Sequence, residues 1–236
     1  MRLCLTTPAN CDNPHILSVR PGNSRESGTN ESLDDPPARR SETIAASYLG
    51  ALQPDLRMTD VADLFLENAE AIFKKQKTLG ERAIAQLSDD QLFAVLDAEA
   101  NSIAIIVRHL HGNMRSRWTD FLTSDGEKPD RQRDTEFLSP AERTRAQVMT
   151  WWEAGWSLVF AALRGLTPAD AAATVRIRGE SMSVLAAIMR QIDHYGQHVG
   201  QIVLLAKHAR GPDWTSLSIP RGRSEEFNRG AIERPA

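Results

Sequence analysis

Residues 181–208 read SMSVLAAIMRQIDHYGQHVGQIVLLAKH, and their pattern determines what the rest of the chain must pack against. Apolar side chains recur in this stretch at steps of three and four residues, at Val184, Leu185, Ile188, Ile192, Tyr195, Val199, Ile202, Val203 and Ala206. Such spacing places them along one side of an α-helix. The sequence therefore predicts a long core helix from Ser181 to His208.

Two histidines lie on the flank of this predicted helix. His194 and His198 are four residues apart, so their rings stand about one turn from each other and can reach the same ion. The pair indicates a metal site. The alternative interpretation is that both are ordinary polar residues with hydrogen-bond partners and no ligand.

The composition is that of a soluble globular protein. Of the 236 residues, 25% are charged and 41% are hydrophobic, and the formal net charge is -3. A chain without a basic excess is not expected to bind nucleic acid or an anionic membrane surface. It also contains no apolar run of about 18 residues and no secretory signal. We expect a cytoplasmic protein whose partner is a small-molecule substrate.

The first 57 residues differ from the rest of the chain. They are rich in Pro, Ser, Asn and charged residues, a composition typical of disorder. Both cysteines, Cys4 and Cys11, lie here, so a metal in the folded part must be held by nitrogen or oxygen. We expect residues 1–57 to be a disordered extension or the product of a misassigned start codon, and residues 58–236 to form one domain with an irregular tail.

Three further segments have the periodicity of amphipathic helices. They are Asp60–Lys77, with Val61, Leu64, Phe65, Ile72 and Phe73 inward and Gly80 as the stop; Asn101–Leu122, capped by Asn101; and a helix beginning at Ser139-Pro140-Ala141-Glu142 that carries Trp151, Trp152 and Trp156. Ser88 and Gln91 have the spacing of a capping box for a short helix. Four long amphipathic helices predict an all-α four-helix bundle.

Two connections stand out. The charged segment Thr123–Leu138 is too polar for the core and too long for a simple turn, so it is either a functional loop or a solvated crossover. The connection Leu166–Gly179 contains ATVRIRG, which can form a short extended piece before the last helix. The bundle topology stays open at this point.

A catalytic metal site needs a third protein ligand. The other histidines of the helical region are His109 and His111 on the second helix and His208 at the end of the fourth. At about 100° per residue, His109 is displaced from the apolar stripe of its helix much as His194 is from its own, whereas His111 lies near the edge of that stripe. Helical geometry alone leaves both open.

The pairing of RHLHGNMRSRWTDFLTSDGEKPDRQRDTEF (Arg108–Phe137) with HYGQHVGQIV (His194–Val203) resembles the DinB-like (YfiT-like) superfamily of metalloenzymes, in a branch without assigned function. The resemblance implies a four-helix bundle that binds a divalent ion, commonly zinc or nickel. It assigns one ligand to the histidine of the Arg108-His109-Leu110 stretch and two to His194 and His198.

The resemblance also implies a chemistry. Characterised members are transferases that use low-molecular-weight thiols such as bacillithiol or mycothiol, including a thiol-dependent maleylpyruvate isomerase. The chain lacks His-Glu-x-x-His, so zincin-type peptidase activity is not expected. We expect a thiol-dependent S-transferase or a small-molecule hydrolase. Candidate substrate contacts are Arg117, Arg131, Arg133 and Asp134, for which the alternative role is that of solvated surface charges.

A second hypothesis belongs to a different class. The chain could be a non-catalytic dimeric helical stress or interaction protein with a structural or vestigial metal, and Trp151, Trp152 and Trp156 would then form the helix–helix interface of a homodimer. Access to the metal separates the two hypotheses. An open position that faces a cleft favours an enzyme, and a fourth protein ligand or a closed site favours a structural role.

Overall fold

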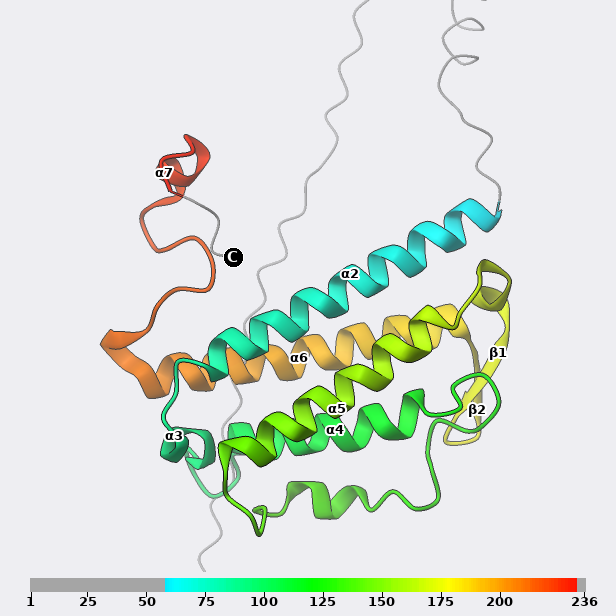
Figure 1. Cartoon of the computed structure of the whole chain (residues 1–236), viewed down its shortest axis with the longest axis horizontal. Coiled ribbons are helices and arrows are strands. Elements are labelled where there is room, and N and C mark those ends of the chain that lie inside the picture. The colour runs from blue at the N-terminus through cyan, green and yellow to red at the C-terminus, as the bar shows by residue number, and fades with distance from the viewer. Residues whose placement is uncertain (1–57, 233–236) are drawn as a thin grey trace, which may run out of the picture. The chain divides into compact units, whose positions relative to one another are not determined.

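The computed structural model of the protein describes residues 58–232, so the expected disorder of residues 1–57 lies outside the described residues. The architecture is an all-α bundle of four long helices (Figure 1), α2 (Met58–Ile84), α4 (Ile103–Trp118), α5 (Arg145–Arg164) and α6 (Val184–Arg210). Helix α4 contacts α5 and α6, and α2 contacts α6 and α5. The predicted fold class is confirmed. Within residues 58–232, no helix has both the length and the hydrophobicity to cross a membrane.

Short elements connect and follow the long helices. They are α3 (Asp89–Phe93), η1 (Arg133–Phe137), η2 (Pro168–Ala172), β1 (Thr174–Ile177), β2 (Glu180–Ser183), η3 (Gly211–Asp213) and α7 (Ser224–Asn228). Strands β1 and β2 form an antiparallel hairpin in which Ile177 is opposite Glu180. Its two turn residues, Arg178 and Gly179, have φ of 57° and 78°, as a tight two-residue hairpin requires. The expected extended piece is thus half of a hairpin.

Helix α6 begins later than predicted. Ser181–Ser183 belong to strand β2, and the Ser183 side chain caps the helix by accepting a hydrogen bond from the backbone N–H of Ala186. The helix ends at Gly211, whose φ of 54° a residue without Cβ adopts readily. Its predicted core stripe is otherwise confirmed, since Ile188, Tyr195 and Ile202 are fully buried.

The prediction that Gly80 ends the first helix is wrong. Helix α2 continues to Ile84. Gly80 is instead a close-packing position, since a Cβ added there would lie 2.5 Å from a ring carbon of Trp152. The predicted inward face is also partly wrong. Val61, Leu64 and Ile72 are 55%, 51% and 39% exposed, whereas Phe73 is fully buried and Phe65 packs against the core, as predicted. The other apolar residues that this helix buries are Ala62, Ala69, Ala83 and Ile84.

The second and third helices begin and end at other residues than expected. Helix α4 is capped by Ser102 rather than Asn101, and it ends at Trp118, short of Leu122. Helix α5 is capped by Thr144. Helix α5 does not begin at Ser139 as predicted, because the Glu142 carboxylate accepts a hydrogen bond from the Thr144 hydroxyl and so does not close a capping box with Ser139.

The capping box that was predicted at the start of the short helix is confirmed. The Ser88 hydroxyl accepts the backbone N–H of Gln91, and the Gln91 side chain accepts the backbone N–H of Ser88. These two bonds satisfy donors at the beginning of α3 that its own turn leaves free.

Aromatic rings fill the centre of the bundle. Phe73 packs edge-on against Trp118 at 5.8 Å and also contacts Trp156 and Tyr195. Trp152 and Trp156 are buried at 1% and 0% exposure inside the single chain. Neither is therefore available for the homodimer interface of the second hypothesis, and of the three tryptophans only Trp151 is partly exposed.

Candidate metal centre

Three histidines from two helices converge at one point. His109 comes from α4, and His194 and His198 come from successive turns of α6. Each offers a ring nitrogen, and these atoms all lie within 4.8 Å of one another. The structure thus brings together the three residues that the resemblance assigned as ligands, while His111 and His208 lie outside this group.

A buried hydrogen-bond chain fixes α4 against α6 beside the histidines. The Trp118 indole N–H donates to the Tyr195 hydroxyl at 2.9 Å, and this hydroxyl donates to Oδ1 of Asn113 at 3.1 Å. Tyr195 follows His194 directly, and Asn113 lies one turn after His109. These two hydrogen bonds therefore fix the register of α4 against α6, and with it the positions of the three histidines.

His109 is oriented by a carboxylate from the charged segment. Its Nδ1 donates to Oε2 of Glu136 at 2.8 Å, and Arg131 donates to both oxygens of Glu136, from Nε at 2.8 Å and from Nη2 at 2.9 Å. A carboxylate on one ring nitrogen fixes the tautomer and leaves the other nitrogen as a metal ligand. Burial by itself would raise the pKa of Glu136, but the hydrogen bonds from His109 and Arg131 outweigh it and hold that pKa below its usual value.

Burial favours the neutral form of the other two rings. Oε1 of Gln201 accepts Nδ1 of His198 at 2.8 Å, and burial lowers the pKa of His198. Burial, reinforced by the neighbouring His198 and His109, lowers the pKa of His194 to about 3. Metal binding requires neutral imidazole, so two of the three ligands are already in the binding form at neutral pH.

One ring nitrogen of the three histidines is buried without a hydrogen-bond partner in the described part of the chain. Nδ1 of His194 is inaccessible to solvent and forms no hydrogen bond with any residue in the described part of the chain. A buried polar atom of this kind calls for an explanation such as an ion or a water molecule. Together with the all-nitrogen donor set, it fits a divalent transition ion.

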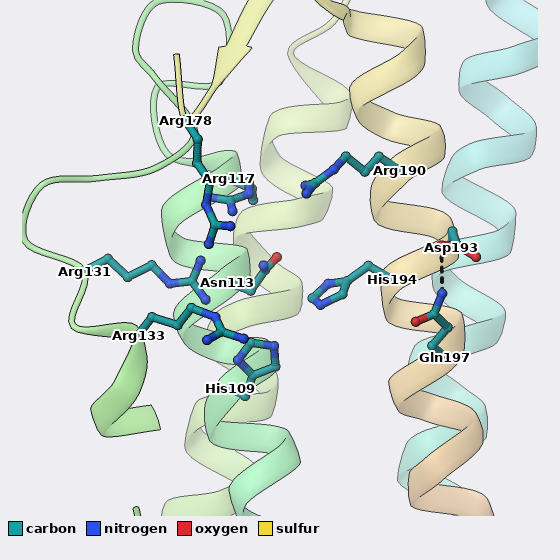
Figure 2. Close-up of a pocket in the computed structure, with 10 residues that line it drawn as sticks. All are labelled: His109, Asn113, Arg117, Arg131, Arg133, Arg178, Arg190, Asp193, His194 and Gln197. Carbon is teal, nitrogen blue, oxygen red and sulfur yellow. Dashed lines mark hydrogen bonds between the residues drawn. The ribbon is translucent and has the colours of Figure 1, made fainter. Parts of the chain in front are cut away.

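A polar cavity of about 270 Å³ adjoins the histidines (Figure 2). It is lined by His109, Asn113, Arg117, Arg131, Arg133, Arg178, Arg190, Asp193, His194 and Gln197. Three of the four residues predicted to contact a substrate, Arg117, Arg131 and Arg133, line it. The fourth, Asp134, does not; its side chain is fully exposed and lies 3.9 Å from Arg133.

Several residues of the site were not predicted from the sequence: Glu136, Gln201, Asn113, Arg178 and Arg190. One local signal pointed to Glu136. Gly112 lies inside a helix, where glycine is unfavourable, and a Cβ on it would come within 2.1 Å of Oε1 of Glu136. The Arg178-Gly179 pair has the form of a tight hairpin turn and could have indicated a fixed arginine. The other residues carry no local signal.

The comparisons with known proteins give a family and no activity. A search of curated proteins finds no match. The model of a family described as a protein of unknown function, DUF1572, matches residues 60–223. This span contains the three histidines and nearly all of the four long helices. The chain therefore belongs to the DUF1572 family.

Proposed function

We propose that the protein is a divalent-metal-dependent enzyme of the DinB-like type, either a thiol-dependent S-transferase or a small-molecule hydrolase. The observation that carries the proposal is the convergence of three histidines beside a polar cavity. His109, His194 and His198 would hold the ion, with zinc and nickel as the expected metals. Three protein ligands and an adjoining cavity are the arrangement of a catalytic rather than a structural centre.

When bound, a divalent ion supplies a Lewis acid that lowers the pKa of a thiol or a water molecule. The protein adds few proton acceptors of its own. Asp193 is the one carboxylate among the residues that line the cavity, and it accepts a hydrogen bond from Gln197 at 2.8 Å. A thiol ionises with a pKa near ~8.5, far more readily than water. A cavity with few general bases therefore favours a thiol cosubstrate, and we place S-transfer ahead of hydrolysis.

Elemental mass spectrometry of the purified protein tests the metal. We expect near-stoichiometric zinc or nickel in the parent and its loss in the double variant His194→Ala/His198→Ala. The matched control is His208→Ala, because His208 is an exposed histidine in the last turn of the same helix and lies outside the cluster. Circular dichroism checks that all three proteins remain helical.

Two results would refute the proposal at this stage. One is a parent that stays metal-free after incubation with zinc or nickel. The other is equal metal content in the parent and the double variant. If the metal is present and depends on the histidines, candidate thiols are assayed with small electrophiles, and turnover that needs both metal and thiol supports the S-transferase.

A further inference from the structure

Arginine dominates the cavity beside the histidines. Five arginines and one aspartate are among its lining residues. The arginines come from four places in the chain: α4 supplies Arg117, the charged segment supplies Arg131 and Arg133, the hairpin turn supplies Arg178, and α6 supplies Arg190. Figure 2 shows Arg131 and Arg178 directed toward the centre from one side and Arg190 reaching in from the opposite helix.

The carboxylates near these arginines do not balance them. Oε2 of Glu127 accepts from Arg117 and from Arg178, each at 3.0 Å, and lies 3.6 Å from Nη1 of Arg131. One carboxylate is thus shared by three guanidinium groups. Glu136 in turn is shared by Arg131 and His109. The wall of the cavity therefore keeps an excess of positive charge.

Two buried guanidinium groups have donors without an acceptor. The side chains of Arg117 and Arg131 are 3% and 2% exposed. Nε of Arg117 and Nη1 of Arg131 are buried and have no hydrogen-bond partner among residues 58–232. Their remaining donors are held by protein acceptors, Gly126 and Glu127 for Arg117 and Glu136 for Arg131. Both side chains are therefore fixed in place, and each buries a donor atom that forms no hydrogen bond, which is costly in the absence of compensating negative charge.

Arg190 adds a guanidinium group from α6, on the side of the cavity opposite Arg131 and Arg178 (Figure 2). It forms no hydrogen bond or ion pair with any residue of the described chain, although it lines the cavity. The Asn113 amide also faces this space; its Oδ1 is occupied by Tyr195, which leaves the NH₂ group as a donor. Guanidinium and amide donors that converge on one small cavity match the acceptor oxygens of an oxyanion.

We propose that this cavity binds the carboxylate or phosphate group of a small organic anion, which is the substrate class of the enzyme. Calling the anion a substrate rests on the proposed function, but the binding of the anion does not. The volume of about 270 Å³ lies near the lower end of the usual range for ligand pockets, about 300–1,000 Å³. It suits a compact metabolite rather than a polymer.

Calorimetric titration with inorganic phosphate, with succinate and with uncharged succinamide tests the proposal, on the full chain both metal-loaded and after chelation. Arg190→Gln and Arg133→Gln are the test variants, because neither arginine has a buried ion pair. Arg164→Gln is the control, since Arg164 is exposed on α5 and lies outside the cavity. This substitution changes the net charge as much as each test variant does.

We expect phosphate or succinate, but not succinamide, to bind both forms of the parent and of Arg164→Gln. We also expect about two- to fivefold weaker binding to each test variant, the effect of one exposed charge contact. If phosphate binds more tightly than succinate, the group that the cavity recognises is a phosphate; if succinate binds more tightly, it is a carboxylate.

Equal anion affinity in the parent and both test variants would overturn the proposal, as would binding of succinamide as tight as that of succinate. If anion binding disappears on chelation and is unaffected in Arg190→Gln, the anion binds to the metal ion and not to the arginines. That result would refute the anion site and leave the metal proposal intact. Arginine-dependent binding to a protein that never takes up metal would support the anion site and refute the proposed function.

Discussion

Gly112→Ala is expected to weaken metal binding even though alanine is the better helix former. Gly112 lies in α4 against the carboxylate that orients His109. A Cβ at this position would stand 2.1 Å from Oε1 and 2.6 Å from Cδ of Glu136, so the carboxylate must move. It is not free to do so at low cost, because Arg131 and His109 both hold it.

The structure gives the size of the effect. Alanine in place of glycine inside a helix stabilises by about 1 kcal/mol, and loss of a hydrogen bond to a charged group costs about 1.5–3 kcal/mol. The free energy of unfolding of Gly112→Ala should therefore fall by about 0.5–2 kcal/mol. Loss of a partner that orients a ligating histidine should weaken metal affinity by about 10–100-fold.

Gly200→Ala is the matched control. Gly200 lies on the exposed face of α6, and a Cβ there would meet nothing within 4 Å, so this variant should gain about 0.5–1 kcal/mol and keep its metal affinity. Urea denaturation of the metal-free proteins measures stability, and competition with a chromophoric chelator measures zinc affinity. If Gly112→Ala is stabilised as much as Gly200→Ala and binds zinc as the parent does, Glu136 does not orient His109.

Three further outcomes are expected. The folded-state pKa of His194 is about 3 against an ordinary 6.5, so its contribution to the stability of the metal-free protein is complete above pH 6.5 and is lost as the pH falls toward 3. The urea midpoint should therefore decrease when the pH is lowered from 7 to 5. If His194→Gln shows the same pH dependence of the urea midpoint, His194 is not its origin. Gly80→Ala should lower the free energy of unfolding by about 1–3 kcal/mol because its Cβ would overlap the buried Trp152 ring, and a gain in the urea midpoint would show that the two helices separate freely. Tyr195→Phe should cost about 1–3 kcal/mol in the same assay, since it leaves the Trp118 N–H and the Asn113 carbonyl without their partner; a neutral result would mean that water replaces the hydroxyl.

Features that depend on neighbours along the chain were predictable. The three- and four-residue spacing in α6 gave the buried stripe of Ile188, Tyr195 and Ile202, and the Ser88–Gln91 spacing gave a capping box. Both depend on contacts within one or two turns of helix. The choice of His109 over His111 came from the family resemblance, because helical angles alone did not separate them.

Features that depend on packing between distant segments were not predictable. Gly80 resembles a helix stop in the sequence, and only the Trp152 ring, which comes from another helix, explains why a glycine stands inside α2. Glu136 belongs to a segment that seemed too charged for the core. It is nevertheless 7% exposed, because His109 of α4 and Arg131 of the same segment both hydrogen-bond to its carboxylate. Periodicity carries no information about such partners.

The charged segment connects the metal centre to the anion cavity through a single side chain. Arg131 holds Glu136 with Nε and Nη2, and the same side chain lines the cavity. Glu136 in turn sets the tautomer of His109. A change at Arg131 must therefore affect ligand orientation and anion binding together, whereas a change at Arg190, which has no such link, should affect anion binding alone. We infer from this difference that the segment between α4 and α5 would align the proposed anion with the histidines that would hold the metal.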